Sequence, residues 1–461
     1  MKYVIQFMAV VLMVLCSCGE SLDIQEQRLV FDPFDARIDG ICYLLSADAR
    51  TAVVTAGDVF YRDNVIIPET VACEGVTYRV VAIAPKAFSG CENLRSVRIP
   101  DSVTDIGESA FLECSGLESI VFPQGLSTVP MRMCRGCYVL READLPPHVR
   151  SIGFEAFSNC TSMTFVTLSD GLEEIGSNAF YCCTSLTSLR LPASVRSIGW
   201  QAFTGCTGLV SVSLPEGLTR LPAECFAHCS RLAEVNIPEG VVYLSEHCFT
   251  KCVSLTRLTL PQSLRSIDRG VFEYCTGLTS MKVPSGVEQI GPLVFSECNH
   301  LTAVDWHPQS IPEGTFKRCT SLTGYTVPEG VTRIYANAFD GCSNLASLML
   351  PATLEAIDPG AFKDCTSLRK VVCLGTSPPQ LPFPTATADD ASLVFEDVDL
   401  SRAVLHVPAS AVPAYQQSYP WRLFGRIEPL TRFFCKQKLS DNETTENDTV
   451  RSVAGHCYAC M

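Results

Sequence analysis

Thirteen cysteines recur at nearly constant spacing along the chain, and thiols are side chains that form disulfides and bind metal ions. Consecutive members are 23 residues apart, except for one step of 21. We call them the ladder cysteines: Cys91, Cys114, Cys137, Cys160, Cys183, Cys206, Cys229, Cys252, Cys275, Cys298, Cys319, Cys342 and Cys365. Their spacing allows three interpretations, namely disulfides between neighbours, a column of metal ligands, or small apolar side chains that fill a core.

The geometry of a stack favours the third interpretation. Neighbouring positions in a stack are about 5 Å apart, which a disulfide can span, but equivalent side chains point in parallel and the bond needs a near-perpendicular twist. Zinc needs four convergent ligands, whereas a stack offers a line. We therefore expect mostly free, buried thiols that each cap a backbone carbonyl weakly, and we expect no metal and no cofactor.

One pair of additional cysteines lies close to a histidine in the repeat pattern. Cys225 and Cys248 occupy the same position, usually alanine, in adjacent repeats, and His228 is near both in sequence. We interpret the pair as a small-residue substitution. A lone disulfide and a metal site that includes His228 are the alternatives.

The fixed period predicts a solenoid of stacked coils. Apolar residues recur three, six and eight places after each ladder cysteine, as in Leu186, Leu189 and Leu191. The last two alternate with polar residues as in a strand, and a proline such as Pro192 then ends it because proline lacks an amide hydrogen.

Two further positions complete each coil. A second apolar pair, such as Val195 and Ile198, predicts a short extended stretch on the opposite wall. An Ala-Phe pair such as Ala202-Phe203 precedes each ladder cysteine and predicts one helical turn with its phenylalanine inward. Phenylalanine fills this position in twelve of thirteen coils, and Cys134 replaces it once.

The expected fold is a repeat solenoid, a right-handed leucine-rich-repeat-like coil of 23-residue repeats, each with short β-strands and a helical turn. A β cap covers its N-terminal end, with a turn at Glu74-Gly75, and an irregular cap covers its C-terminal end. We assign a signal peptide to residues 1–17, a linker from the lipid anchor to 18–40, the β cap to 41–82, the solenoid to 83–373, the C-terminal cap to 374–430 and a disordered tail to 431–461.

Composition and charge narrow the function classes. Charged residues make up 18% of the chain and hydrophobic residues 47%, which suffices for a continuous core. The net charge of -14 is unsuited to nucleic acid or to acidic membrane surfaces, so no nucleic-acid partner is expected.

The first residues read as a bacterial export signal. Lys2 precedes an apolar run from Val4 to Leu15 that is too short to span a bilayer. The segment ending at Cys18 resembles a lipobox, so Cys18 is the expected lipidation site and the protein is held to a membrane through this anchor. Gly19 follows where aspartate would favour retention in the inner membrane. We expect an outer membrane lipoprotein that faces the cell surface, with the periplasmic face and a plain secretory signal as alternatives.

The coil after Cys298 is two residues short. Trp306 and His307 stand where other coils place an aliphatic residue and then proline. A local bend with Trp306 inward is one interpretation, and a binding notch with His307 is the other, because irregular loops on rigid scaffolds often bind ligands. The candidate binding surface comprises outward strand residues and this pair: Arg98, Asp144, Phe165, Arg190, Glu234, Trp306 and His307.

We find no catalytic residues, because no serine, histidine and acid share a coil face, no paired carboxylates recur and no glycine-rich phosphate loop follows a strand. The tail contains a CxxC motif at Cys457 and Cys460, preceded by His456. A local disulfide or a tail without a role is the favoured interpretation, with zinc binding as the alternative.

The lipobox, the 23-residue coils with Ala-Phe and ladder cysteine, and both caps together resemble the BspA-like leucine-rich repeat surface lipoproteins of Bacteroides and related bacteria. The resemblance covers about residues 41–430, and the segment from Tyr415 through Trp421 to Ile427 is similar to that family's terminal cap. It departs at Met133-Cys134, at the short coil and in the tail. The resemblance implies surface attachment, including binding of host matrix proteins such as fibronectin or fibrinogen, and coaggregation.

The leading hypothesis is a lipid-anchored cell-surface module that binds protein, as an adhesin or interaction scaffold for host matrix or other bacterial surface proteins. The alternative is a surface glycan-binding accessory lipoprotein, which should expose several aromatic platforms for sugar stacking. An enzyme with an unrecognised site is the third possibility.

Overall fold

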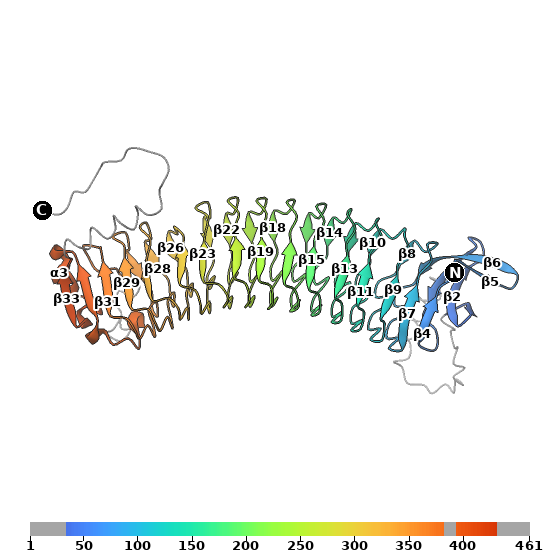
Figure 1. The fold of residues 1–461 in the computed structure, drawn as a ribbon, viewed down its shortest axis with the longest axis horizontal. Helices are drawn as coiled ribbons and strands as arrows, with labels where there is room; N and C mark the ends of the chain where they lie inside the picture. The colour runs from blue at the N-terminus through green and yellow to red at the C-terminus, as the bar shows by residue number, and fades with distance from the viewer. Residues whose placement is uncertain (1–33, 382–392, 431–461) are drawn as a thin grey trace, which may run out of the picture. The chain divides into compact units, whose positions relative to one another are not determined.

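The computed structural model describes residues 34–381 and 393–430, which belong to one compact unit. The signal segment, Cys18, most of the expected linker and the tail with its CxxC motif lie outside the described residues. In Figure 1 the coils follow one another in chain order from the blue strands to the red ones. No helix within the described ranges is long and apolar enough to cross a bilayer.

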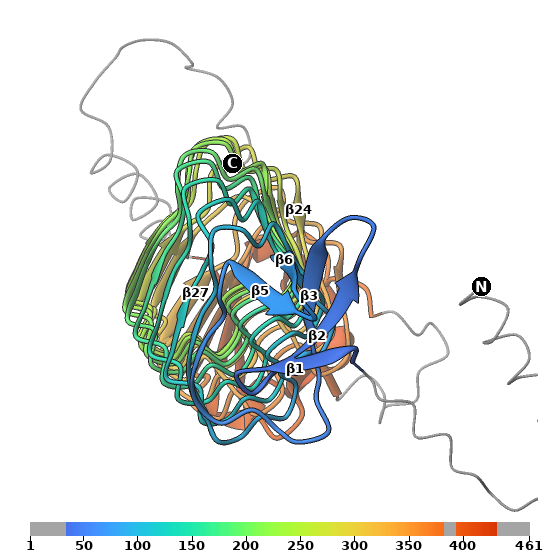
Figure 2. The same cartoon turned by 90° about the vertical axis from the view of Figure 1, so that its right-hand side faces the viewer.

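The N-terminal cap is a sheet that lies across the end of the coil stack (Figure 2). Its strands, in spatial order, are β1 (Ala36–Ile38), β2 (Ile41–Ser46), β3 (Thr51–Thr55), β6 (Val76–Ile83) and β5 (Thr70–Cys73). The turn expected at Glu74-Gly75 is confirmed, with φ of 49° and 78° that match a hairpin turn with both central residues left-handed. The cap begins earlier than expected, because β1 lies within the segment 18–40 that was assigned to the linker. This strand was missed because three residues are too few to show an alternating pattern.

The first coil also begins earlier than expected. Strand β4 (Asp63–Ile66) follows β3 in sequence but pairs in parallel with β7 (Leu94–Arg98), and not with the cap sheet. The segment 41–82 therefore supplies both the cap and the first rung of the solenoid.

Each regular coil contributes one strand to each of two walls. Where strands of neighbouring coils pair, they pair in parallel with residues 23 apart in register. After β7, the first wall continues through β9 (Ser119–Val121), β11 (Glu142–Asp144), β13 (Phe165–Thr167), β15 (Ser188–Arg190), β17 (Ser211–Ser213), β19 (Glu234–Asn236), β21 (Arg257–Thr259), β23 (Ser280–Lys282), β25 (Ala303–Asp305), β27 (Gly324–Thr326), β29 (Ser347–Leu350) and β31 (Lys370–Cys373). The 23-residue solenoid is thereby confirmed.

The second wall consists of two-residue strands, as the second apolar pair predicted. They are β8 (Asp105–Ile106), β10 (Thr128–Val129), β12 (Ser151–Ile152), β14 (Glu174–Ile175), β16 (Ser197–Ile198), β18 (Arg220–Leu221), β20 (Tyr243–Leu244), β22 (Ser266–Ile267), β24 (Gln289–Ile290), β26 (Ser310–Ile311), β28 (Arg333–Ile334) and β30 (Ala356–Ile357).

The expected helical turn before each ladder cysteine is wrong in its backbone conformation. Glu155 and Asn159, five residues and one residue before Cys160, have φ of 54° and 62°, whereas a right-handed helix needs negative φ throughout. The N–H of Glu155 donates to the Ser177 carbonyl at 3.0 Å, and that of Asn159 to the Tyr181 carbonyl at 2.7 Å. The third side of each coil is thus a ribbon of turns that is hydrogen-bonded to the next coil.

The phenylalanines of this ribbon point inward and form a column, as predicted. From Phe157 to Phe316 successive ring centroids are 5.5 to 6.0 Å apart, with planes within 13° of parallel. The column extends past the repeats, because Tyr61 packs 4.6 Å from Phe88 and Phe395 stacks 5.4 Å from Phe362. Neither extension was predicted.

The ladder cysteines cap carbonyls, as expected. The Cys252 thiol donates to the Phe226 carbonyl of the preceding coil at 3.1 Å, and the same bond recurs from Cys114 to Cys365. All described cysteines are free thiols. Burial raises the pKa of ladder thiols such as Cys206 and Cys275, in both cases to about 12.

The C-terminal cap keeps the first wall although the sequence period has ended. Strand β32 (Val404–Val407) pairs in parallel with β31, and β33 (Arg426–Pro429) pairs in parallel with β32. Between and around them lie η1 (Leu393–Phe395), η2 (Leu400–Arg402), η3 (Ala409–Ala411), α3 (Val412–Gln417) and η4 (Trp421–Leu423). Tyr415 in α3 is buried, and its hydroxyl lies 2.9 Å from the Cys373 thiol.

Candidate functional site

The outward side chains of the first wall form a continuous surface, which we call the strand face. It comprises the exposed first and third residues of the three-residue strands, since the middle residue of each points into the core. Within each hydrogen-bonded group of strands, such as β15-β17-β19-β21, equivalent residues lie in register and form two columns. The same repeat positions continue these columns across the breaks in strand pairing.

Five of the predicted binding residues lie exposed on the strand face. Arg98, Asp144 and Arg190 occupy one column, whereas Phe165 and Glu234 occupy the other. Within the first column one coil separates each residue from the next, which places them roughly 10 Å apart. These residues therefore form separate contact points and do not converge on one small-molecule site.

The strand face also contains residues that the sequence analysis did not select. Val121 is 52% exposed and lies in register beside Arg98. Arg257 lies in register beside Glu234, which places opposite charges side by side. Their strand positions could have identified both, because they share the repeat positions of residues that we did select.

The remaining pair of predicted binding residues is divided between core and surface. Trp306 is 2% exposed, packs edge-on between Phe295 and Phe316, and donates through Nε1 to the Tyr325 hydroxyl at 2.7 Å. His307 is exposed. The inward position of Trp306 is confirmed and its assignment to a binding surface is wrong, because the larger ring fills the core of the short coil.

Cys225 and Cys248 lie in the alanine position of neighbouring coils, and both are fully buried. His228 is exposed, so it faces away from both thiols. No group of three or more metal-ligating side chains occurs within residues 34–381 and 393–430. The arrangement matches the substitution of a small core residue.

Exposed aromatic side chains are spread over different repeat positions. Tyr138, Phe165, Trp200, Tyr274 and Tyr335 are between 38% and 54% exposed. Tyr138 and Phe165 lie one and five residues after a ladder cysteine. Trp200, Tyr274 and Tyr335 lie six, one and seven residues before one. No two of these five side chains share a repeat position, so together they form no aligned platform for stacking sugars.

Stacked coils of a 23-residue leucine-rich motif, with one strand per coil on a continuous wall, define a leucine-rich-repeat solenoid. Residues 81–209, 128–256, 173–302 and 304–376 match the family described as "BspA type Leucine rich repeat region". These matches span more than half of the chain, which therefore belongs to the BspA-type leucine-rich repeat family.

Two solved structures are similar over most of the chain. A leucine-rich repeat protein from Bacteroides ovatus is 28% identical, with a TM-score of 0.54, over 74% of this chain and 94% of that one. A leucine rich cell surface protein from Faecalibacterium prausnitzii is 25% identical, with a TM-score of 0.51, over 79% of this chain and 98% of that one. No curated protein matches the chain. The family relationship supports a protein-interaction scaffold, and proteins of this family are typically non-catalytic.

Proposed function

We propose that the chain is a lipid-anchored cell-surface module that binds protein through its strand face. The observation that carries this proposal is the strand face itself, a surface of in-register columns on a backbone that every coil holds in place. Repeat proteins bind partners through such extended surfaces. Exposed Val121 and Phe165, among charged and hydroxyl side chains, supply the apolar contacts that protein interfaces need.

The partner class is a surface protein, either of the host matrix or of another bacterium. The resemblance to BspA-like lipoproteins supports this class, as does the relative described as a cell surface protein. A partner that spans several coils would contact Arg98, Asp144 and Arg190 in succession, and the spacing of these charges would select among partners.

The experiment measures binding of the mature protein to immobilised fibronectin, fibrinogen, bacterial surface proteins and polysaccharides. Replacing Phe165 by Ser together with Arg190 by Glu should weaken protein binding at least about tenfold, because it removes an apolar contact and reverses a charge. Val242→Ser, beside strand β20 on the opposite wall, is the matched control and should bind normally. Saturable binding to polysaccharide with none to protein would contradict the proposal.

The anchor is tested separately from the binding surface. Cys18→Ala should abolish incorporation of a labelled fatty acid and release the protein from the membrane fraction, because the thiol that takes the lipid is gone. Cys16→Ala is the control and should remain lipidated. Protease treatment of intact cells then distinguishes the cell surface from the periplasm.

A further inference from the structure

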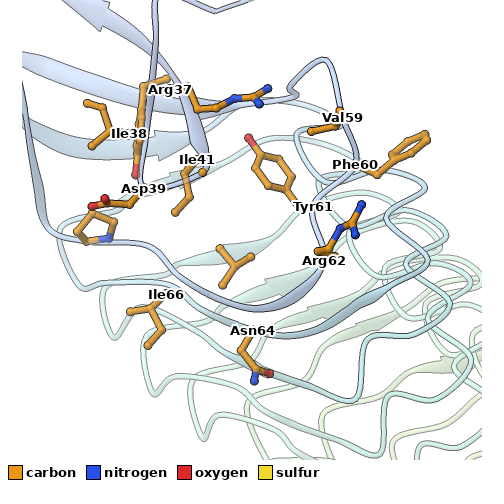
Figure 3. A pocket seen from close by; sticks show the side chains of 14 residues that line it. Arg37, Ile38, Asp39, Ile41, Val59, Phe60, Tyr61, Arg62, Asn64 and Ile66 are labelled. Carbon is orange, nitrogen blue, oxygen red and sulfur yellow. The ribbon is translucent and has the colours of Figure 1, made fainter.

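A cavity of about 390 Å³ lies where the cap meets the first rung of the solenoid. The turn between β1 and β2, the loop at residues 59–62 and strand β4 line it, and it is open to solvent. Figure 3 shows Asp39 and Ile66 on one side of the cavity, Phe60 and Arg62 on the opposite side, and Tyr61 between them. Its volume is within the range of sites that bind small ligands or single peptide side chains.

The walls of this cavity include the most exposed apolar side chains of the described residues. Val59, Phe60 and Ile66 are 59%, 69% and 70% exposed, and every other large hydrophobic residue described is below these values. All three line this one cavity. Such a cluster marks an interaction site.

A buried hydroxyl at the same cavity has no partner. The Tyr43 side chain is fully buried and lines the cavity, and its hydroxyl has no hydrogen-bond partner among the described residues. Burial, together with the nearby Asp39 carboxylate, raises the pKa of Tyr43, so the hydroxyl remains a donor. Tyr61 differs, because its hydroxyl accepts from the Cys42 N–H at 3.1 Å and donates to the Thr55 carbonyl.

The charged groups at the cavity are not equivalent. Arg37 forms an ion pair with Asp58. Arg62 is exposed and forms no ion pair within the described part of the chain. The Arg62 guanidinium, which has no ion-pair partner among the described residues, lies next to the exposed Phe60 ring. This arrangement favours a ligand that has a carboxylate beside an apolar group.

Strand β4 presents an open edge to the same place. It is the terminal strand of the sheet β4-β7-β9, and no described strand pairs with its other side. The N–H groups of Asp63 and Ile67 point to the β7 side, where they donate to Asn93 and Arg98 carbonyls. Because successive residues of a strand alternate, the backbone of Ile66 faces the open edge, where an extended peptide can pair.

We propose that this cavity binds an extended peptide segment of a protein partner. An apolar side chain of the peptide enters between Phe60 and Ile66, a neighbouring carboxylate pairs with Arg62, and the peptide backbone adds to the edge of β4. The proposal rests on the proposed function in protein binding, and it assigns a second surface with its own sequence preference.

The test pans a phage-displayed library of random peptides against the full mature chain. Enriched peptides should share an apolar residue next to aspartate or glutamate. A synthetic copy of an enriched peptide should bind Phe60→Ser and Arg62→Glu at least about tenfold more weakly, and Tyr43→Phe several-fold more weakly. Phe165→Ser on the strand face is the matched control and should bind the peptide normally.

A charge exchange makes the test sharper. Replacing the acidic residue of the peptide by lysine should restore binding to Arg62→Glu and weaken binding to the unchanged protein. Enriched peptides that bind Phe60→Ser, Arg62→Glu and Tyr43→Phe as tightly as the unchanged protein would overturn the proposal. Panning that enriches no such motif would overturn it too. A glycan that binds in a Phe60-dependent way, or tighter peptide binding after deletion of residues 18–33, would assign the cavity to another occupant and also overturn it.

The two proposals fail separately. If Phe60→Ser and Arg62→Glu leave peptide binding unchanged while Phe165→Ser with Arg190→Glu still weakens capture of an immobilised protein, the cavity proposal alone is wrong. If the cavity variants lose the peptide but no surface protein binds the strand face, the strand-face proposal is wrong and the cavity remains a peptide site.

Discussion

The central coils and the N-terminal cap differ in how completely their side chains and backbone groups find partners. In a central coil every position has an equivalent above and below it, so backbone groups, phenylalanine rings and thiols all find partners in the neighbouring coil. The cap ends this repetition, and there a buried Tyr43 hydroxyl and three exposed apolar side chains have no equivalent neighbours. Repetition provides stability, and its interruption leaves groups available for recognition.

The largest predicted effect tests the thiols of the coils by pH. An unfolded thiol has a pKa near 8.5, and burial raises the folded values, to about 12 for Cys206, Cys275 and Cys342. Between pH 7.5 and 9.5 the unfolded chain loses protons that the folded coils keep, so stability falls as pH rises. The loss should be about 1.4 kcal/mol for each of these three thiols, measured by guanidinium denaturation under reducing conditions.

The control for this prediction removes two of the thiols. Cys206→Ala with Cys275→Ala should reduce the pH-dependent loss by about 2.7 kcal/mol, whatever the two substitutions do to stability at neutral pH. Thr276→Ala, which lies in the same region, is only partly buried and carries no thiol, should keep the full dependence. A midpoint that does not change between the two pH values would contradict the assignment of the ladder cysteines to a protonated core.

The second prediction compares one phenylalanine from each region. Phe226 stacks between Phe203 and Phe249 at 5.5 and 5.6 Å, so Phe226→Ala should cost about 3–5 kcal/mol of unfolding free energy. Phe60→Ala in the cap should change it by no more than about 0.5 kcal/mol, because that ring is 69% exposed. Chemical denaturation of both variants measures the difference, and equal losses would remove the distinction between core and recognition side chains.

The structure of the central coils could be predicted from the sequence, because each position of the pattern recurs in nearly every coil and so supports the same inference many times. The inward phenylalanine, the two walls and the thiol contact with a carbonyl all follow from positions that recur in nearly every coil. The turn ribbon could not be predicted in the same way. Its left-handed residues include Glu155, Asn178 and Gln201. Residues of these types do not indicate a positive φ in a sequence, whereas glycine does because it adopts positive φ readily.

The irregular parts were predicted least well, for a physical reason. Tyr61 continues the phenylalanine column and β4 continues the strand wall, but both lie outside the period that would have revealed them. The cavity at the cap depends on how the loop at residues 59–62 packs against the β1–β2 turn. Contacts between segments that are distant in sequence leave no local pattern, so the site required the structure.

A third prediction concerns the short coil, the second interruption of the repeat. Tyr325→Phe removes the acceptor of the buried Trp306 N–H, which is 2.7 Å from the hydroxyl. The variant should lose about 1–3 kcal/mol, because a buried donor is left unsatisfied. Tyr335→Phe, whose ring is 40% exposed, is the control and should be nearly neutral. Thermal unfolding of the two variants would show whether the short coil depends on this bond.

The smallest predicted effect lies on the surface of the coils, where repetition also aligns charges. Arg150 and Glu173 are 23 residues apart in sequence, and Nη1 of Arg150 lies 2.6 Å from Oε1 of Glu173. Their side chains are nevertheless 68% and 57% exposed. Glu173→Gln should therefore cost only about 0.2–1 kcal/mol, and less at high salt, because solvent screens the pair. Denaturation at low and high ionic strength measures the loss. A loss as large as that of Tyr325→Phe would mean that surface contacts between coils also hold the solenoid together, and the interior columns would then not be its main source of stability.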